Sequence, residues 1–168
     1  MPHVIVESDA SQPERDPSDL FSFSVETIDL LALLSFGYAE PFGSQHQLTR
    51  FVRRLRQKHS IDITPLMTFY DRDVTDAEDL ANLDAAWQPA AALSTTLQAT
   101  LTALGDDRET AALLDGFDQL HTLLPELSAM ADWAAAREAR IRLSFSMDPP
   151  AADQASGSND ANGDPVQQ

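Results

Sequence analysis

A cationic cluster is the feature of the sequence that most clearly suggests chemistry. Arg50, Arg53 and Arg54 lie close together, and His46 precedes Arg50 by about one helical turn. On a helix over residues 45–58 the three arginines share one face, because a helix completes a turn every 3.6 residues. The opposite face is apolar, which predicts that it packs against the protein; its members are Leu48, Phe51, Val52 and Leu55. The arginine face could bind phosphate or carboxylate groups.

Three kinds of partner remain open for these arginines. The first is an acidic cluster in the same chain, which would form surface ion pairs with them; it consists of Asp71, Asp73, Asp76, Glu78 and Asp79. The second is an acidic protein, or the acidic face of a second copy. The third is nucleic acid, bound through Arg50, Arg53 and Arg54. Nucleic acid is not favoured, because a sequence pI of about 4.3 predicts repulsion of a polyanion over most of the surface.

Patterns for catalysis or metal binding are sparse. Asp118 and His121 place a carboxylate and an imidazole one helical turn apart, which would suit a small metal-dependent hydrolase. Helical metal sites of this kind repeat the motif on a second helix, and the sequence contains no second copy. It also lacks Gly-x-Ser-x-Gly, a phosphate-binding glycine loop and His-Glu-x-x-His. We therefore expect no catalytic, metal-binding or cofactor-binding residues, and a protein that is not an enzyme.

Composition and charge limit the remaining choices. The 168 residues include 27 acidic and 11 basic side chains, for a net charge of −16, and no cysteine. The lack of cysteine excludes disulfide frameworks and thiolate metal sites. We predict a flexible acidic segment over 1–19, a single helical domain over 20–147 and a disordered acidic tail over 148–168, because both ends are too polar to form a core. The many aspartates and the single lysine would also suit adaptation to high salt, although GC-rich codon usage could produce part of this pattern.

Apolar residues at helical spacing dominate the middle of the chain. Helices are expected near 25–36, 45–58, 75–87, 89–105 and 106–124, and a last one is expected to begin at Pro125. This pattern predicts a mainly α fold, a compact bundle of about five to six helices. Short extended segments near 3–7, 61–64 and 140–147 could add one small β element. The last of these alternates strictly, so that helix and strand both remain open there.

One predicted helix is unusual because it lacks ionisable side chains. Residues 85–105 contain none. A helix that its own domain covers on both sides would explain this. Alternatively, its small neutral face contacts another subunit or a partner, because the cores of interfaces are depleted in charge. Leu97 and Leu101 on its leucine stripe are then candidate interaction residues.

The favoured function is that of a non-catalytic helical interaction protein: an adaptor, assembly factor or accessory subunit. It would bind a protein partner, or form a homo-oligomer, through the uncharged helix 85–105, the arginine face of helix 45–58, or both. The alternatives are a regulator that binds nucleic acid and a metal-dependent hydrolase. The N-terminus lacks the basic flank of a signal peptide, and no apolar run is long enough for a membrane span. We therefore expect a cytoplasmic protein without membrane contact.

Overall fold

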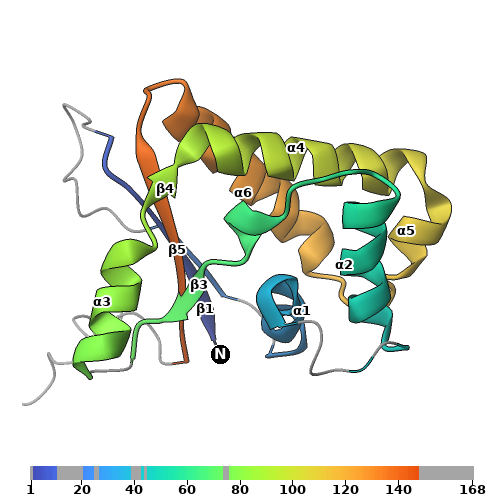
Figure 1. The fold of residues 1–168 in the computed structure, drawn as a ribbon, viewed down its shortest axis with the longest axis horizontal. Coiled ribbons are helices and arrows are strands. Elements are labelled where there is room, and N and C mark those ends of the chain that lie inside the picture. The colour runs from blue at the N-terminus through green and yellow to red at the C-terminus, as the bar shows by residue number, and fades with distance from the viewer. Residues whose placement is uncertain are drawn as a thin grey trace, which may run out of the picture.

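The protein has a mixed α/β fold, seen in a computed structural model of the chain (Figure 1). The structure describes residues 2–10, 21–24, 27–38, 43, 45–73 and 76–147. This described part contains six α-helices and one five-stranded sheet. Residues 11–19 of the predicted N-terminal segment and the whole predicted tail over 148–168 lie outside the described residues.

The last strand of the chain, β5 (Arg140–Ser146), lies at the centre of the sheet. On one side it pairs antiparallel with β1 (His3–Ser8), which pairs in turn with β2 (Phe21–Ser24). On its other side β5 pairs with two short strands. β3 (Phe69–Asp71) runs parallel to it, and β4 (Gln88–Pro89) runs antiparallel.

The prediction of a mainly α bundle is wrong. Residues near 3–7 and 140–147, expected at most to add a small β element, form the two longest strands of the sheet. β1 is also an inner strand, so that residues 3–8 of the predicted flexible segment belong to the folded part. The segment at 61–64 is not a strand. It leads into a short 3₁₀-helix, η2 (Thr64–Leu66), in which Pro65 is the second residue. Local periodicity missed the sheet because its strands pair across long sequence separations.

The six helices match the predicted segments in order but differ at their ends. They are α1 (Thr27–Tyr38), α2 (Gln47–Gln57), α3 (Ala77–Ala85), α4 (Ala90–Asp106), α5 (Arg108–Ala112) and α6 (Leu120–Ala135). The helix predicted over 106–124 is interrupted after α5, where Gly116 adopts a φ of +90° that suits glycine. Pro125 does not begin α6 but lies inside it, on an exposed side, where water can satisfy the carbonyl group that loses its hydrogen bond.

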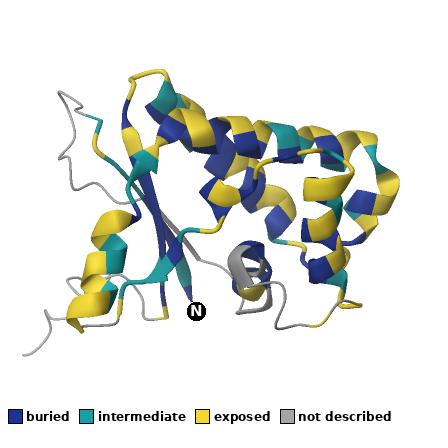
Figure 2. Cartoon of the chain, in the orientation of Figure 1, coloured by how far each residue is buried: buried dark blue, intermediate teal, exposed yellow. Residues whose placement is uncertain are grey.

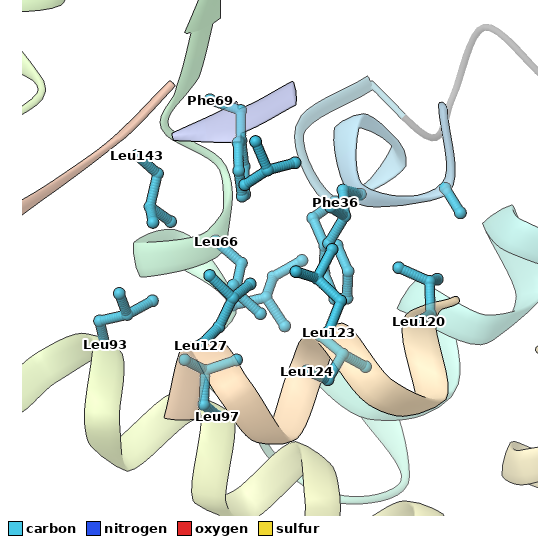
Figure 3. Close-up of a cluster of buried hydrophobic side chains, with 14 of the residues drawn as sticks. Phe36, Leu66, Phe69, Leu93, Leu97, Leu120, Leu123, Leu124, Leu127 and Leu143 are labelled. Carbon is cyan, nitrogen blue, oxygen red and sulfur yellow. The ribbon is translucent and has the colours of Figure 1, made fainter. Parts of the chain in front are cut away.

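The hydrophobic core lies between the sheet and the helices on one of its faces. α4 and α6 pack side by side, and the Ala90 N–H at the start of α4 donates to the Ala139 carbonyl beyond the end of α6 at 3.0 Å, which makes the pair antiparallel (Figure 1). Strand residues such as Val4, Val6 and Leu143 point into this core. Figure 3 shows leucines of α4 and α6 meeting Leu66 of η2, Phe36 of α1 and the strand residues Phe69 and Leu143.

Most of the helices bury one side and expose the other (Figure 2). α3 is different, because none of its residues is buried. Among the described residues, no helix has both the length and the apolar character that crossing a membrane requires.

The burial of α4 gives a first prediction. Replacing Leu97, which is 0% exposed, with alanine should lower the free energy of unfolding by about 2–5 kcal/mol, because the change leaves a cavity in the core. Leu80 on α3, which is 49% exposed, provides the matched control, and Leu80→Ala should cost less than about 1 kcal/mol. Urea unfolding followed by circular dichroism measures both. Similar losses in the two variants would contradict the placement of α4.

Candidate functional site

Helix α2 carries the predicted cationic cluster and packs by its apolar side. The buried side chains are those predicted, Leu48, Phe51, Val52 and Leu55, together with Thr49. His46 lies at the N-cap, where its Nδ1 accepts a hydrogen bond from the Leu48 N–H at 3.2 Å. This candidate residue therefore has a structural role at the start of the helix. The opposite side of α2 faces outward and carries the arginines (Figure 2).

Arg54 differs from the other arginines of α2 because its guanidinium group forms ion pairs with described carboxylates. It donates hydrogen bonds to Asp107 at 2.8 Å and to the Thr110 hydroxyl at 3.1 Å. It also forms an ion pair with Glu109 at 3.0 Å. These acidic partners follow α4, and they are not members of the 71–79 cluster. Arg54 thus joins α2 to α5.

Asp107 is the centre of this internal network. One carboxylate oxygen meets Lys58 at 2.8 Å and His59 at 3.0 Å, in addition to Arg54. The other oxygen caps α5 by accepting from the backbone N–H groups of its first turn. Hydrogen bonds from Lys58 and Thr110, followed by those from Arg54 and His59, outweigh desolvation and hold the pKa of Asp107 far below its usual value.

The remaining exposed arginines of α2 form a separate surface. Arg50, Arg53 and Arg56, which we call the arginine strip, follow one another at three-residue spacing and are exposed. In the part of the chain that the structure describes, none of them forms an ion pair with a carboxylate. Arg56 acts at longer range on Asp62, whose pKa is lowered first by hydrogen bonds from Thr64 and to a smaller extent by this arginine.

An open hollow of about 330 Å³ adjoins the arginine strip at Arg56. Its other lining residues come from the segment after α2, and they include Ile61, Ile63 and Met67. Met67 is 42% exposed and places an apolar side chain at the edge of this hollow. This part of the surface therefore combines Arg56 with a mixed lining, in which apolar side chains alternate with the polar residues Ser60, Asp62 and Thr64.

A second charged group lies on the face of the sheet that points away from the core. The Glu7 carboxylate of β1 accepts hydrogen bonds from Arg142 of β5 at 2.6 Å and from Arg72 at 2.5 Å. Arg142 also lies over the Trp87 ring, 4.7 Å from its centroid. Burial alone would raise the pKa of Glu7, but the hydrogen bonds and charges of the two arginines lower it.

Sequence reasoning missed this group. Strict alternation over 140–147 places Arg140 and Arg142 on one face of a strand, but only the register of β1 against β5 sets Glu7 opposite Arg142. Because each arginine is already engaged with Glu7, this cluster contributes to the fold and offers no obvious ligand site.

The other candidate residues do not come together into a site. Asp118 and His121 are both exposed near the start of α6, and the described residues contain no group of three or more potential metal ligands. Leu97 is buried in the core, and Leu101 packs against that core with only part of its side chain exposed. The exposed side of α4 instead carries neutral residues, namely Ala91, Ala92, Thr95, Gln98 and Thr102, of which Gln98 donates a hydrogen bond to Asp132 of α6 at 2.8 Å.

Comparisons with known proteins give no further guide to the site. No family model matches the chain, and no significant similarity is found to curated proteins or to solved structures. Any functional conclusion therefore depends on the surface chemistry described above.

The Asp107 network gives a prediction of pH dependence. Because the folded-state pKa of Asp107 is lowered, its ionised form adds stability above the ordinary aspartate pKa of about 3.9, and this stability is lost as the pH falls toward the folded-state value. Asp107→Asn keeps a capping oxygen but removes the charge. It should lower the melting temperature at neutral pH, and the difference from the wild type should shrink progressively below about pH 4.

Thermal unfolding at a series of pH values measures this difference. The exposed Asp118 provides the control, and Asp118→Asn should show a much smaller difference at every pH. A difference for Asp107→Asn that stayed constant down to about pH 3 would contradict the assigned pKa direction.

The Glu7 network gives a prediction of stability. Glu7→Gln should lower the free energy of unfolding by about 1–3 kcal/mol, because two largely buried guanidinium groups lose their shared carboxylate. Glu126→Gln, an exposed change on α6, should stay within about 0.5 kcal/mol. Chemical denaturation of both variants measures the two costs, and equal costs would count against a stabilising role for Glu7.

Proposed function

We propose that this protein is a non-catalytic binding protein that recognises an acidic protein surface through the arginine strip of α2. One observation carries the proposal: Arg50, Arg53 and Arg56 face outward without an ion pair to any described carboxylate, in a chain with 27 acidic residues. Guanidinium groups bind carboxylates through directed hydrogen bonds, so that three of them in a row suit an acidic partner.

The contrast with Arg54 supports a binding role for the strip. Arg54 belongs to the same helix, but its guanidinium is already bound by Asp107 and Glu109. It holds α2 against α5 and thus fixes the helix that presents the other three arginines. The helix also buries its apolar side, which adds to the rigidity of the surface. A preorganised surface loses less conformational entropy on binding than a mobile one.

The alternatives have weaker support. Nucleic acid binding through Arg50, Arg53 and Arg54 would require Arg54 to leave two carboxylates, and those carboxylates would repel a phosphate backbone. An interface through Leu97 would require a core side chain. A metal-dependent reaction at Asp118 and His121 would need further ligands, which the described residues do not bring near.

Titration with a labelled acidic peptide tests the proposal. A fluorescein-labelled glutamate decapeptide should bind the wild type measurably by fluorescence anisotropy at about 50 mM salt and much less at about 500 mM. Arg50→Ala/Arg53→Ala should weaken binding about 2- to 30-fold, because each exposed charge pair contributes roughly 0.2–1 kcal/mol. Arg137→Ala/Arg140→Ala removes the same formal charge from exposed positions elsewhere and is the control; because Arg140 also forms an ion pair with Asp9 at 2.8 Å, circular dichroism checks that this variant is folded.

The same titration with a labelled DNA duplex covers the main alternative. Tighter binding of the duplex, lost in the Arg50/Arg53 variant, would replace the proposed function with nucleic acid recognition. Equal weakening of peptide binding by the Arg137/Arg140 variant would show a response to overall charge and would refute a specific role of α2.

A further inference from the structure

The end of the molecule around α3 is acidic and loosely packed. Asp76, Glu78 and Asp79 lie at the start of α3, and no described cation forms an ion pair with any of them. Loss of hydration, followed by a hydrogen bond with Asp76 and the negative charges of Asp76, Glu78 and Asp71, raises the pKa of Asp79 above its usual value. Because no described cation pairs with these carboxylates, their repulsion is relieved only by solvent within the described chain.

This acidic end also exposes a large apolar side chain. Leu80 follows Asp79 directly and is 49% exposed, on a helix without any buried residue. Burial of this leucine against a partner would remove apolar surface from water, while the neighbouring carboxylates would set the orientation of the contact.

The acidic and basic surfaces lie at opposite ends of one molecule. Figure 1 shows α3 at one end of the longest axis and α2 beside α5 at the other. The arginine strip therefore cannot meet the 71–79 cluster of its own chain while the fold is intact, which excludes the internal pairing considered for the sequence. Two copies in head-to-tail arrangement bring these surfaces together.

We propose that the arginine strip and the adjoining hollow of one copy bind the α3 end of a second copy. This inference rests on the proposed function and names the acidic partner. In the contact, Arg50, Arg53 and Arg56 face Asp76, Glu78 and Asp79, and Leu80 enters the hollow beside Met67. The two surfaces differ, so that the contact is heterologous and leaves one free surface of each kind at the ends of an assembly. Further copies can add to those ends.

Salt should affect this assembly in two opposing ways. Two copies that each carry a net charge of −16 repel one another at long range, so that very low salt disfavours association. At about 0.15 M the Debye length is only about 8 Å, which screens this repulsion more strongly than it screens charge pairs in contact. Association should therefore be strongest at moderate salt and weak at about 1 M.

Charge reversal at each end tests the contact in the full chain. Sedimentation velocity at about 0.15 M salt should give a wild-type mass that rises with concentration above the 18.4 kDa of one chain. Arg50→Glu/Arg53→Glu makes both ends acidic, and Glu78→Lys/Asp79→Lys makes both ends basic. Each variant alone should remain monomeric. An equimolar mixture should assemble again, because each end of one variant then meets the opposite charge on the other.

Recovery in the mixture separates loss of the contact from loss of folding, since misfolded variants would not recover. A wild type that is monomeric at every concentration and salt would overturn this inference, while peptide binding through Arg50 and Arg53 could still stand. Assembly of either variant alone to the wild-type extent, or a mixture that fails to recover, would overturn it as well. A wild type that self-associates but does not bind the labelled peptide would instead refute the proposed function, and with it the use of the arginine strip in this contact.

Disulfide trapping tests the placement of Leu80 directly. The natural chain has no cysteine, so that every cross-link must come from introduced residues. A mixture of Met67→Cys and Leu80→Cys should form a mixed disulfide under mild oxidation. Replacing the first partner with Leu31→Cys, which alters another exposed apolar residue, should give at least about tenfold less cross-linked product. Equal cross-linking of both mixtures would refute the proposed position of Leu80.

Discussion

The antiparallel pairing of β1 with β5 is the constraint on which the rest of the structure depends. It joins residues 3–8 to residues 141–146, so that nearly the whole described chain lies between two adjacent strands. Alternation gives this pair two different faces. Val4, Val6 and Leu143 point into the core, while Glu7 and Arg142 meet on the other side. One register therefore sets both the packing of the helices and the partly buried charge network.

Two groups of arginines differ in their surroundings. Arg54 joins α2 to α5 through Asp107. Arg142 joins β5 to β1 through Glu7, and Arg72, which directly follows β3, contacts the same carboxylate. Among the described residues, the arginine strip forms no such ion pair. In a strongly acidic protein, exposed arginines without a described partner form a distinct surface, and their position opposite the acidic α3 end gives the molecule a charge asymmetry along its longest axis.

Several features could be predicted because neighbours in sequence decide them. The apolar side of α2 and the outward direction of Arg50 and Arg53 follow from helical spacing. The ion pair between Arg54 and Asp107 could not be predicted in the same way. Although Arg54 lies on the same face of α2, Asp107 is 53 residues away in sequence, and only the path of α4 brings it near. Likewise, the sequence shows directly that 85–105 lacks charge, but burial of Leu97 in the core depended on tertiary packing.

The sequence by itself determined the local amphipathic elements, the acidic net charge and the cationic side of α2, because these depend on composition and on spacing within a few residues. The tertiary structure decided the fold class and the use of each charge. Backbone hydrogen bonds of a sheet can pair strands from opposite ends of a chain, and no local periodicity records which strand is the partner. The same long-range pairing neutralises Arg142 with Glu7, whereas the arrangement of the helices keeps the arginine strip apart from the acidic end.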